Sequence, residues 1–143
     1  MELMEPVALR LKPQQDLKLE LDQFVTNQQI EAACILTCVG SLSEANLRFA
    51  NQPEGKVFTE KFEIVSLTGV LSQHGSHYHI AIANSTGHTI GGHLLPGCLI
   101  YTTAEIVLGI LPHHRFRREF DSTSGFRELA IEINCPTRPN PLS

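Results

Sequence analysis

The stretch from residue 74 to residue 95 constrains the fold most strongly, because its apolar residues alternate and it holds five of the seven histidines. Residues 77–83 read HYHIAIA. As a β-strand, this segment places Tyr78 and Ile80 on one face and His77 and His79 on the other. The first face is apolar and predicts contact with a core. The second face presents two imidazoles beside small alanine side chains.

The turn after this strand decides whether His93 joins the other two histidines. If residues 85–87 form a three-residue loop with Gly87 in the left-handed conformation, counting outward places His93 opposite His79 on the same face. A two-residue loop would move it to the other face. The apolar pattern favours the longer loop, because the two apolar residues of the return strand then join the core face.

Three histidines on one face of a hairpin are typical of a metal site. Neutral imidazole is a common zinc ligand, and three protein ligands with an open fourth position is the arrangement of a catalytic zinc site. His77 and His79 leave their strand about 7 Å apart, which lets both rings reach one ion. Exposed histidines on a polar sheet face are the alternative. We favour a Zn²⁺ site formed by His77, His79 and His93.

Length and composition indicate one globular domain. The chain has 143 residues, of which 42% are hydrophobic and 18% charged. A chain of this length is large enough to bury a hydrophobic core, and we expect residues 1–134 to form a single domain. The formal charge of −4 argues against a free-standing nucleic-acid binder, which normally has a basic face. The tail at residues 135–143, with three prolines, is predicted to be disordered.

The sequence also bears on compartment and redox state. No apolar run is long enough to cross a membrane, and the N-terminus carries acids where a signal peptide would carry positive charge. The four cysteines lack Cys-X-X-Cys spacing and lie mostly in apolar runs. We therefore expect a cytoplasmic protein without a membrane partner, whose cysteines are buried, reduced thiols rather than zinc ligands.

Apolar periodicity predicts one helix and six or seven strands. The helix is expected to begin at an Asp16 cap and to end near residue 27. The run at 32–39 is typical of a central strand buried on both faces, with a polar connection from residue 40 to residue 46. Other strands are predicted at 6–11, at 61–72 with Gly69 as a bend or bulge, in the histidine hairpin, at 98–111 and at 126–134. The predicted class is α+β, with a strongly bent, mostly antiparallel sheet and one main helix.

Charged residues in and between these strands are further candidates for a site. Glu105 lies within a predicted strand, where its carboxylate either faces solvent or serves a metal or bound water as a general acid or base. Glu44 is the alternative carboxylate. Arg10 and Arg48 can hold the anionic group of a small ligand. Residues 113–118 form a basic patch that could touch phosphates, although a solvated loop is the favoured interpretation.

Several short motifs taken together resemble a known family. They are Arg10-Leu11 with Asp16-Leu17, Gly-Ser-Leu-Ser at 40–43 with Leu-Arg at 47–48, Phe-Glu-Ile-Val-Ser-Leu-Thr-Gly at 62–69, Gly-Gly-His-Leu at 91–94 with Gly97, and Asp121 with residues 125–129. From about residue 6 to residue 134 the chain resembles a prokaryotic PPC domain, the plant-and-prokaryote domain that accompanies AT-hooks in plant proteins.

This resemblance implies a homotrimer and, for prokaryotic members with His-X-His and Gly-Gly-His as at His77, His79 and His93, a zinc site. The segment at 62–65 is similar to a plant motif associated with protein–protein contacts. DNA binding in plants resides in a separate Arg-Gly-Arg-Pro AT-hook, which these 143 residues do not contain. The fold is shared with α-acetolactate decarboxylase, a zinc lyase with a similar histidine set, which implies a reaction class at most.

The histidine pattern therefore predicts a zinc-binding protein that acts as a metal-dependent enzyme or binds a small molecule, and the resemblance implies that it is a homotrimer. In this reading Glu105 or Glu44 supplies a carboxylate and Arg10 holds an anion. The alternative is a DNA-associated or regulatory assembly module without catalysis.

Overall fold

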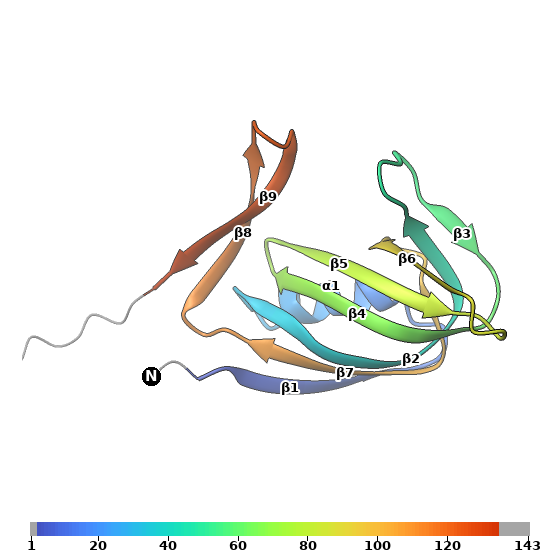
Figure 1. Cartoon of the computed structure of the whole chain (residues 1–143). Helices are drawn as coiled ribbons and strands as arrows, with labels where there is room; N and C mark the ends of the chain where they lie inside the picture. Colours follow the sequence, from blue (N-terminus) through green and yellow to red (C-terminus); the bar gives the residue numbers. More distant parts are fainter. Residues whose placement is uncertain (1–2, 135–143) are drawn as a thin grey trace, which may run out of the picture.

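A computed structural model describes residues 3–134, which form nine strands and one helix (Figure 1). The elements are β1 (Glu5–Leu11), α1 (Leu17–Asn27), β2 (Ala33–Arg48), β3 (Lys56–Phe58), β4 (Phe62–Ser72), β5 (Gly75–Ala83), β6 (Thr89–Leu94), β7 (Leu99–Ile110), β8 (His114–Asp121) and β9 (Phe126–Ile133). The expected α+β class, with one helix and a mostly antiparallel sheet, is confirmed. The tail predicted to be disordered, 135–143, lies outside the described residues.

Seven of these strands form one sheet, and the long strand β2 bends it. The order is β1-β7-β2-β4-β5-β6, with β3 paired to β2. The first part of β2 pairs with β7 and β4, and its last residues pair with β6 through Leu47 opposite Leu94. The path through β4, β5 and β6 therefore returns to β2. The register of β2 against β7 shifts near Ile35 and Leu42, and such irregularities bend a strand.

The polar connection expected from residue 40 to residue 46 is wrong, because these residues continue β2. Ser41 is buried and shares a hydrogen bond with Thr102 Oγ1 at 2.9 Å, so a polar residue there is accommodated inside the sheet. Leu42 and Ala45 are buried in the core. Tertiary pairing on both sides of β2 outweighed the local turn-forming composition.

Helix α1 covers one face of the sheet (Figure 1). It begins after Asp16, whose side chain accepts a hydrogen bond from the Leu19 N–H at 3.0 Å, as predicted. Leu17, Leu21 and Val25 recur every four residues on one side of the helix and are fully buried against the sheet. Each such side chain contributes about 1.5–3 kcal/mol through burial.

The central position predicted for residues 32–39 is confirmed, but their burial on both faces is wrong. β2 lies between β7 and β4. Val39 is 61% exposed and Leu36 is 46% exposed, because within residues 3–134 a helix covers only the other face.

The sequence predicted a bend or bulge at Gly69, and the structure has no bulge there. Gly69 pairs in register with Tyr78, and the register shift of β4 lies between Ile64 and Ser66. A Cβ at Gly69 would lie 2.5 Å from Cδ1 of Tyr78, so the glycine provides room for the aromatic ring.

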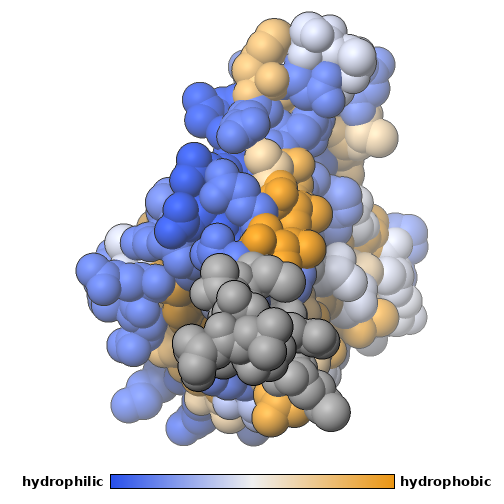
Figure 2. Space-filling view, turned by 90° about the vertical axis from the view of Figure 1, so that its left-hand side faces the viewer, coloured by the Kyte–Doolittle hydropathy of each residue, from blue (hydrophilic) through white to orange (hydrophobic). Residues whose placement is uncertain are grey.

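The basic segment predicted as a solvated loop is strand β8, which pairs with β9 in a separate hairpin. This hairpin projects from the main sheet (Figure 1). It exposes four large apolar side chains, namely Phe120, Phe126, Ile131 and Ile133. Figure 2, a view of the side that carries the hairpin, shows apolar residues interrupting a largely hydrophilic surface.

The predicted state of the cysteines is confirmed in part. Cys38 and Cys98 are buried and free, whereas Cys34 is free and partly exposed. Cys135 lies outside the described residues. Between residues 3 and 134, no helix is long and apolar enough to cross a membrane.

Candidate metal site

The loop between β5 and β6 has the length that the apolar pattern predicted. The Asn84 N–H donates to the His88 carbonyl oxygen at 2.9 Å, and the Gly87 N–H donates to the Asn84 backbone carbonyl oxygen at 2.9 Å. Gly87 has φ +80°, the left-handed conformation that closes a three-residue loop. The predicted register is therefore confirmed, with His79 opposite His93.

This register brings His77, His79 and His93 together on the sheet face opposite α1. One ring nitrogen from each can be chosen so that all three lie within 4.8 Å of one another. The ring centroid of His77 is 4.9 Å from that of His79 and 5.0 Å from that of His93. The ring centroids of His79 and His93 are 5.8 Å apart. His77 and His93 are half-buried, and His79 is exposed.

The donor set fits a zinc-type ion. Nitrogen ligands of tetrahedral zinc lie about 2.0–2.1 Å from the metal and therefore about 3.4 Å from one another. The three nitrogens lie within 4.8 Å of one another, so they must move closer together to hold one ion. Three imidazoles leave a fourth position for another ligand.

Burial and surrounding cations keep two of the histidines neutral, the form that binds metal. Burial, and after it the positive charge of Arg48, lowers the pKa of His93 to about 4. Burial also lowers the pKa of His77, with smaller contributions from His79 and Arg118, while Glu128 acts against them. At neutral pH the lone pairs of both rings are therefore available.

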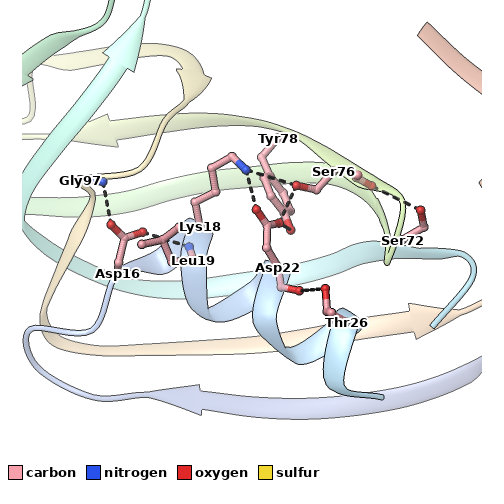
Figure 3. A network of polar contacts seen from close by, with 10 residues as sticks. Asp16, Lys18, Leu19, Asp22, Thr26, Ser72, Ser76, Tyr78 and Gly97 are labelled. Atoms are coloured by element: carbon pink, nitrogen blue, oxygen red, sulfur yellow. Dashed lines mark hydrogen bonds and ion pairs between the residues drawn. The ribbon is translucent and has the colours of Figure 1, made fainter. Parts of the chain in front are cut away.

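Strand β5 is fixed from the opposite side by a polar network with α1 (Figure 3). Asp22 accepts hydrogen bonds from Tyr78 OH at 2.8 Å, from Ser76 Oγ at 2.5 Å and from Lys18 Nζ at 2.5 Å. Burial and the charge of Asp22 raise the pKa of Tyr78, so the phenol remains a donor. Because Tyr78 stands between two of the histidines in sequence, this network holds the strand that presents them.

The structure does not bring Glu105 or Arg10 to the histidines. They lie opposite each other on β7 and β1, and the Arg10 Nε donates to Thr103 Oγ1 at 3.1 Å. Strand β7 is separated from β5 by β2 and β4, about 14 Å across the sheet. Glu44 is on β2, four residues and about 13 Å along the strand from Arg48.

Arg48 does lie at the histidines, because it pairs with His93 where β2 meets β6. A hollow of about 330 Å³ is lined by Arg48 and all three histidines. A second hollow, of about 350 Å³, lies beside His77 and His93. Its other lining residues are Arg48, Ser76, Arg118, Phe126, Arg127 and Glu128. The sequence did not predict that residues of the β8–β9 hairpin line this hollow. Among them, only Arg118 had been noted, as part of the basic patch.

Comparisons with known proteins agree with this architecture. The family model of the Plants and Prokaryotes Conserved (PCC) domain matches residues 1–112. The bifunctional protein GlmU of Synechococcus sp. (strain JA-3-3Ab) is 50% identical over 134 residues, which are 93% of this chain and 22% of that protein. The chain thus spans about a fifth of the length of this curated relative.

Two solved structures are similar over nearly the whole chain. A hypothetical protein of Salmonella enterica is 39% identical, with a TM-score of 0.91 over 94% of this chain and 98% of that one. A metal-containing protein of Archaeoglobus fulgidus is 25% identical, with a TM-score of 0.76 over 91% of this chain and 99% of that one.

Proposed function

The chain belongs to the Plants and Prokaryotes Conserved (PCC) domain family, and on that premise we propose that it binds one transition-metal ion at His77, His79 and His93. The observation that carries the proposal is the convergence of three imidazole nitrogens within 4.8 Å. The metal content of the Archaeoglobus relative supports it. Zn²⁺ is the proposed ion, because three neutral imidazoles with an open fourth position suit it.

The metal ion would bind a small molecule at its open position. The proposed function of the site is a metal-dependent reaction of that molecule. A zinc ion held this way acts as a Lewis acid on a carbonyl or phosphoryl oxygen. Arg48 lies in register with His93, so its guanidinium is placed to hold an anionic group beside the ion. Glu44, Glu105 and Arg10 lie too far from the histidines within one chain to share this role, so we assign them none.

Zinc content per chain tests the proposal. Protein purified without added metal, and again after incubation with Zn²⁺ and desalting, is expected to hold about one ion per chain. His79→Ala and His93→Ala should lose it. His88→Ala is the matched control, because His88 is an exposed histidine of the same hairpin outside the cluster. Wild-type protein that stays free of metal after incubation would refute the site.

We also propose that copies of this chain assemble as a homotrimer in the cytoplasm. The exposed apolar side chains support assembly, because several lie on one connected set of strands. Val39, Val65 and Tyr101 are 61%, 58% and 43% exposed on β2, β4 and β7. Val65 falls in the segment that is similar to the plant contact motif. Light scattering coupled to size exclusion should give three times the mass of 15.8 kDa, and a monomer at micromolar concentration would contradict this.

We do not extend the proposal to DNA. Within the basic patch of β8, Arg115 and Arg117 both face Glu132, at 3.7 and 3.5 Å, and Arg115 also binds Glu31. The formal charge of the chain is −4. A labelled duplex retarded at physiological salt would favour the alternative, a DNA-associated module.

A further inference from the structure

The β8–β9 hairpin forms one wall of the hollow beside His77 and His93. The hollow has a volume of about 350 Å³. That volume is at the lower end of the range of small-molecule pockets in proteins, so it suits a small ligand. The hairpin follows residue 112, where the family match ends, so this wall lies outside the matched segment.

The base of the hairpin is fixed to the main sheet. The Arg115 Nε lies 2.8 Å from Glu31 Oε2, and the Phe116 N–H donates to the Glu31 carbonyl oxygen at 2.9 Å. Ser72 Oγ donates to the Phe116 carbonyl oxygen at 2.8 Å, and the Phe116 side chain is buried. Arg118 follows two residues later, so its backbone is held in a defined position relative to β5.

The Arg118 side chain lines the hollow, and its guanidinium is not paired with another group within residues 3–134. Its aliphatic stem packs over the start of β5, where a Cβ at Gly75 would lie 3.0 Å from the Arg118 Cγ. Within residues 3–134 its guanidinium makes neither an ion pair nor a hydrogen bond. Arg48 makes one long hydrogen bond, 3.4 Å from Nη1 to the Gln52 carbonyl oxygen. The guanidinium groups of Arg48 and Arg118 therefore have N–H groups that are available to bind a ligand.

The remaining charges leave the hollow positive. Arg127 Nη2 donates to the Arg118 carbonyl oxygen at 2.6 Å, so this third arginine braces the hairpin. Glu128 is the one carboxylate among the lining residues. Three arginines against one carboxylate, beside neutral imidazoles, favour an anionic ligand.

We propose that Arg48 and Arg118 form an oxyanion subsite, which holds the carboxylate or phosphate group of a small ligand next to the metal position. A planar guanidinium fork matches the geometry of either group with paired hydrogen bonds. The ligand is then an acid with a second oxygen that can reach the ion. This inference names the ligand class for the metal site and rests on the proposed function.

Calorimetric titration of the zinc-loaded protein tests the subsite, with inorganic phosphate in one series and lactate in the other. We expect binding in at least one series, and the series that binds identifies the oxyanion. Arg118→Gln and Arg48→Gln should each weaken binding at least about tenfold with zinc content unchanged, because charge-assisted bidentate hydrogen bonds are lost. Arg118→Lys, which keeps the charge and loses the fork, should weaken it less.

Arg117→Gln is the matched control, because Arg117 is the neighbouring residue on β8 and lies 3.5 Å from Glu132. It should bind the anion as the wild type does. Equal affinity of wild type and Arg118→Gln, or no binding of either anion by the zinc-loaded wild type, overturns the proposal. If the protein holds no zinc, the same titration is run on the metal-free protein. Binding that depends on Arg118 then supports the subsite independently of the metal, and absence of binding overturns it.

Discussion

His79 lies directly opposite His93 across the β5–β6 ladder, with ring centroids 5.8 Å apart. The two residues are separated by a loop of odd length, and this parity puts both side chains on one face. His77, two residues before His79, shares that face because strand side chains alternate. The candidate site is thus a consequence of register.

Moving one histidine along the same face should abolish metal binding. In the double variant His79→Ala with Ala81→His, the number of histidines is unchanged and both positions still face away from α1. The displaced ring begins about 7 Å from its original position, too far to complete the set. Zinc per chain, measured by mass spectrometry of the metal, is expected to fall to background while the thermal transition of the metal-free protein is preserved. One zinc per chain in this variant would contradict the geometry.

Tyr78→Phe should destabilise the protein although it removes one atom. The phenol donates to Asp22 at 2.8 Å, and without it a carboxylate near the core loses a partner. The expected loss in the free energy of unfolding is about 1–2 kcal/mol, measured by urea denaturation. Tyr101→Phe is the control, because the Tyr101 hydroxyl makes no hydrogen bond within residues 3–134, and its change should stay within about 0.5 kcal/mol. Equal stability of the two variants would show that the network contributes nothing measurable.

The metal-free protein should lose stability on acidification partly through His93. Its pKa is about 4 when folded, because of burial and of Arg48, and other nearby groups are His77, His79 and Lys18. The ordinary histidine pKa is about 6.5, so between these values the unfolded chain takes up a proton that the folded chain refuses. The free energy of unfolding therefore falls as the pH drops from about 6.5 to about 4, and this contribution is fully present above that interval.

Urea midpoints of wild-type protein and His93→Gln, both in chelator, measure this effect. The wild type should lose more stability than the variant between pH 7 and pH 4.5. Parallel pH profiles would show that His93 titrates alike in the folded and unfolded chains.

Cys38 and Cys98 should resist alkylation in the native protein. The pKa of each thiol is raised to about 11, chiefly by burial; at Cys98 a hydrogen bond with Asn46 acts against burial, and the carboxylates of Asp16 and Glu44 act with it. At pH 8 only about one thiol in a thousand is then the reactive thiolate. Peptide mapping after iodoacetamide treatment should find both unmodified, and modified only in urea. Rapid labelling of either in the native protein would contradict their burial.

Local pattern alone predicted the helix cap at Asp16, the alternation of β5 and the odd loop that aligns His79 with His93. These features depend on interactions within a few residues, where side-chain period and turn chemistry leave few alternatives. The sequence therefore determined the three-histidine face before any tertiary contact was considered.

The sequence did not determine what surrounds that face. Whether residues 40–46 turn or extend depended on pairing with β7, and the placement of Arg118 beside His77 depended on Glu31 and Ser72 anchoring the hairpin. Glu105 and Arg10 were candidate site residues from the sequence. In the structure they lie opposite each other on β7 and β1, away from the histidines. Such contacts join residues tens of positions apart, and their free energy comes from packing of whole elements, which local periodicity does not encode.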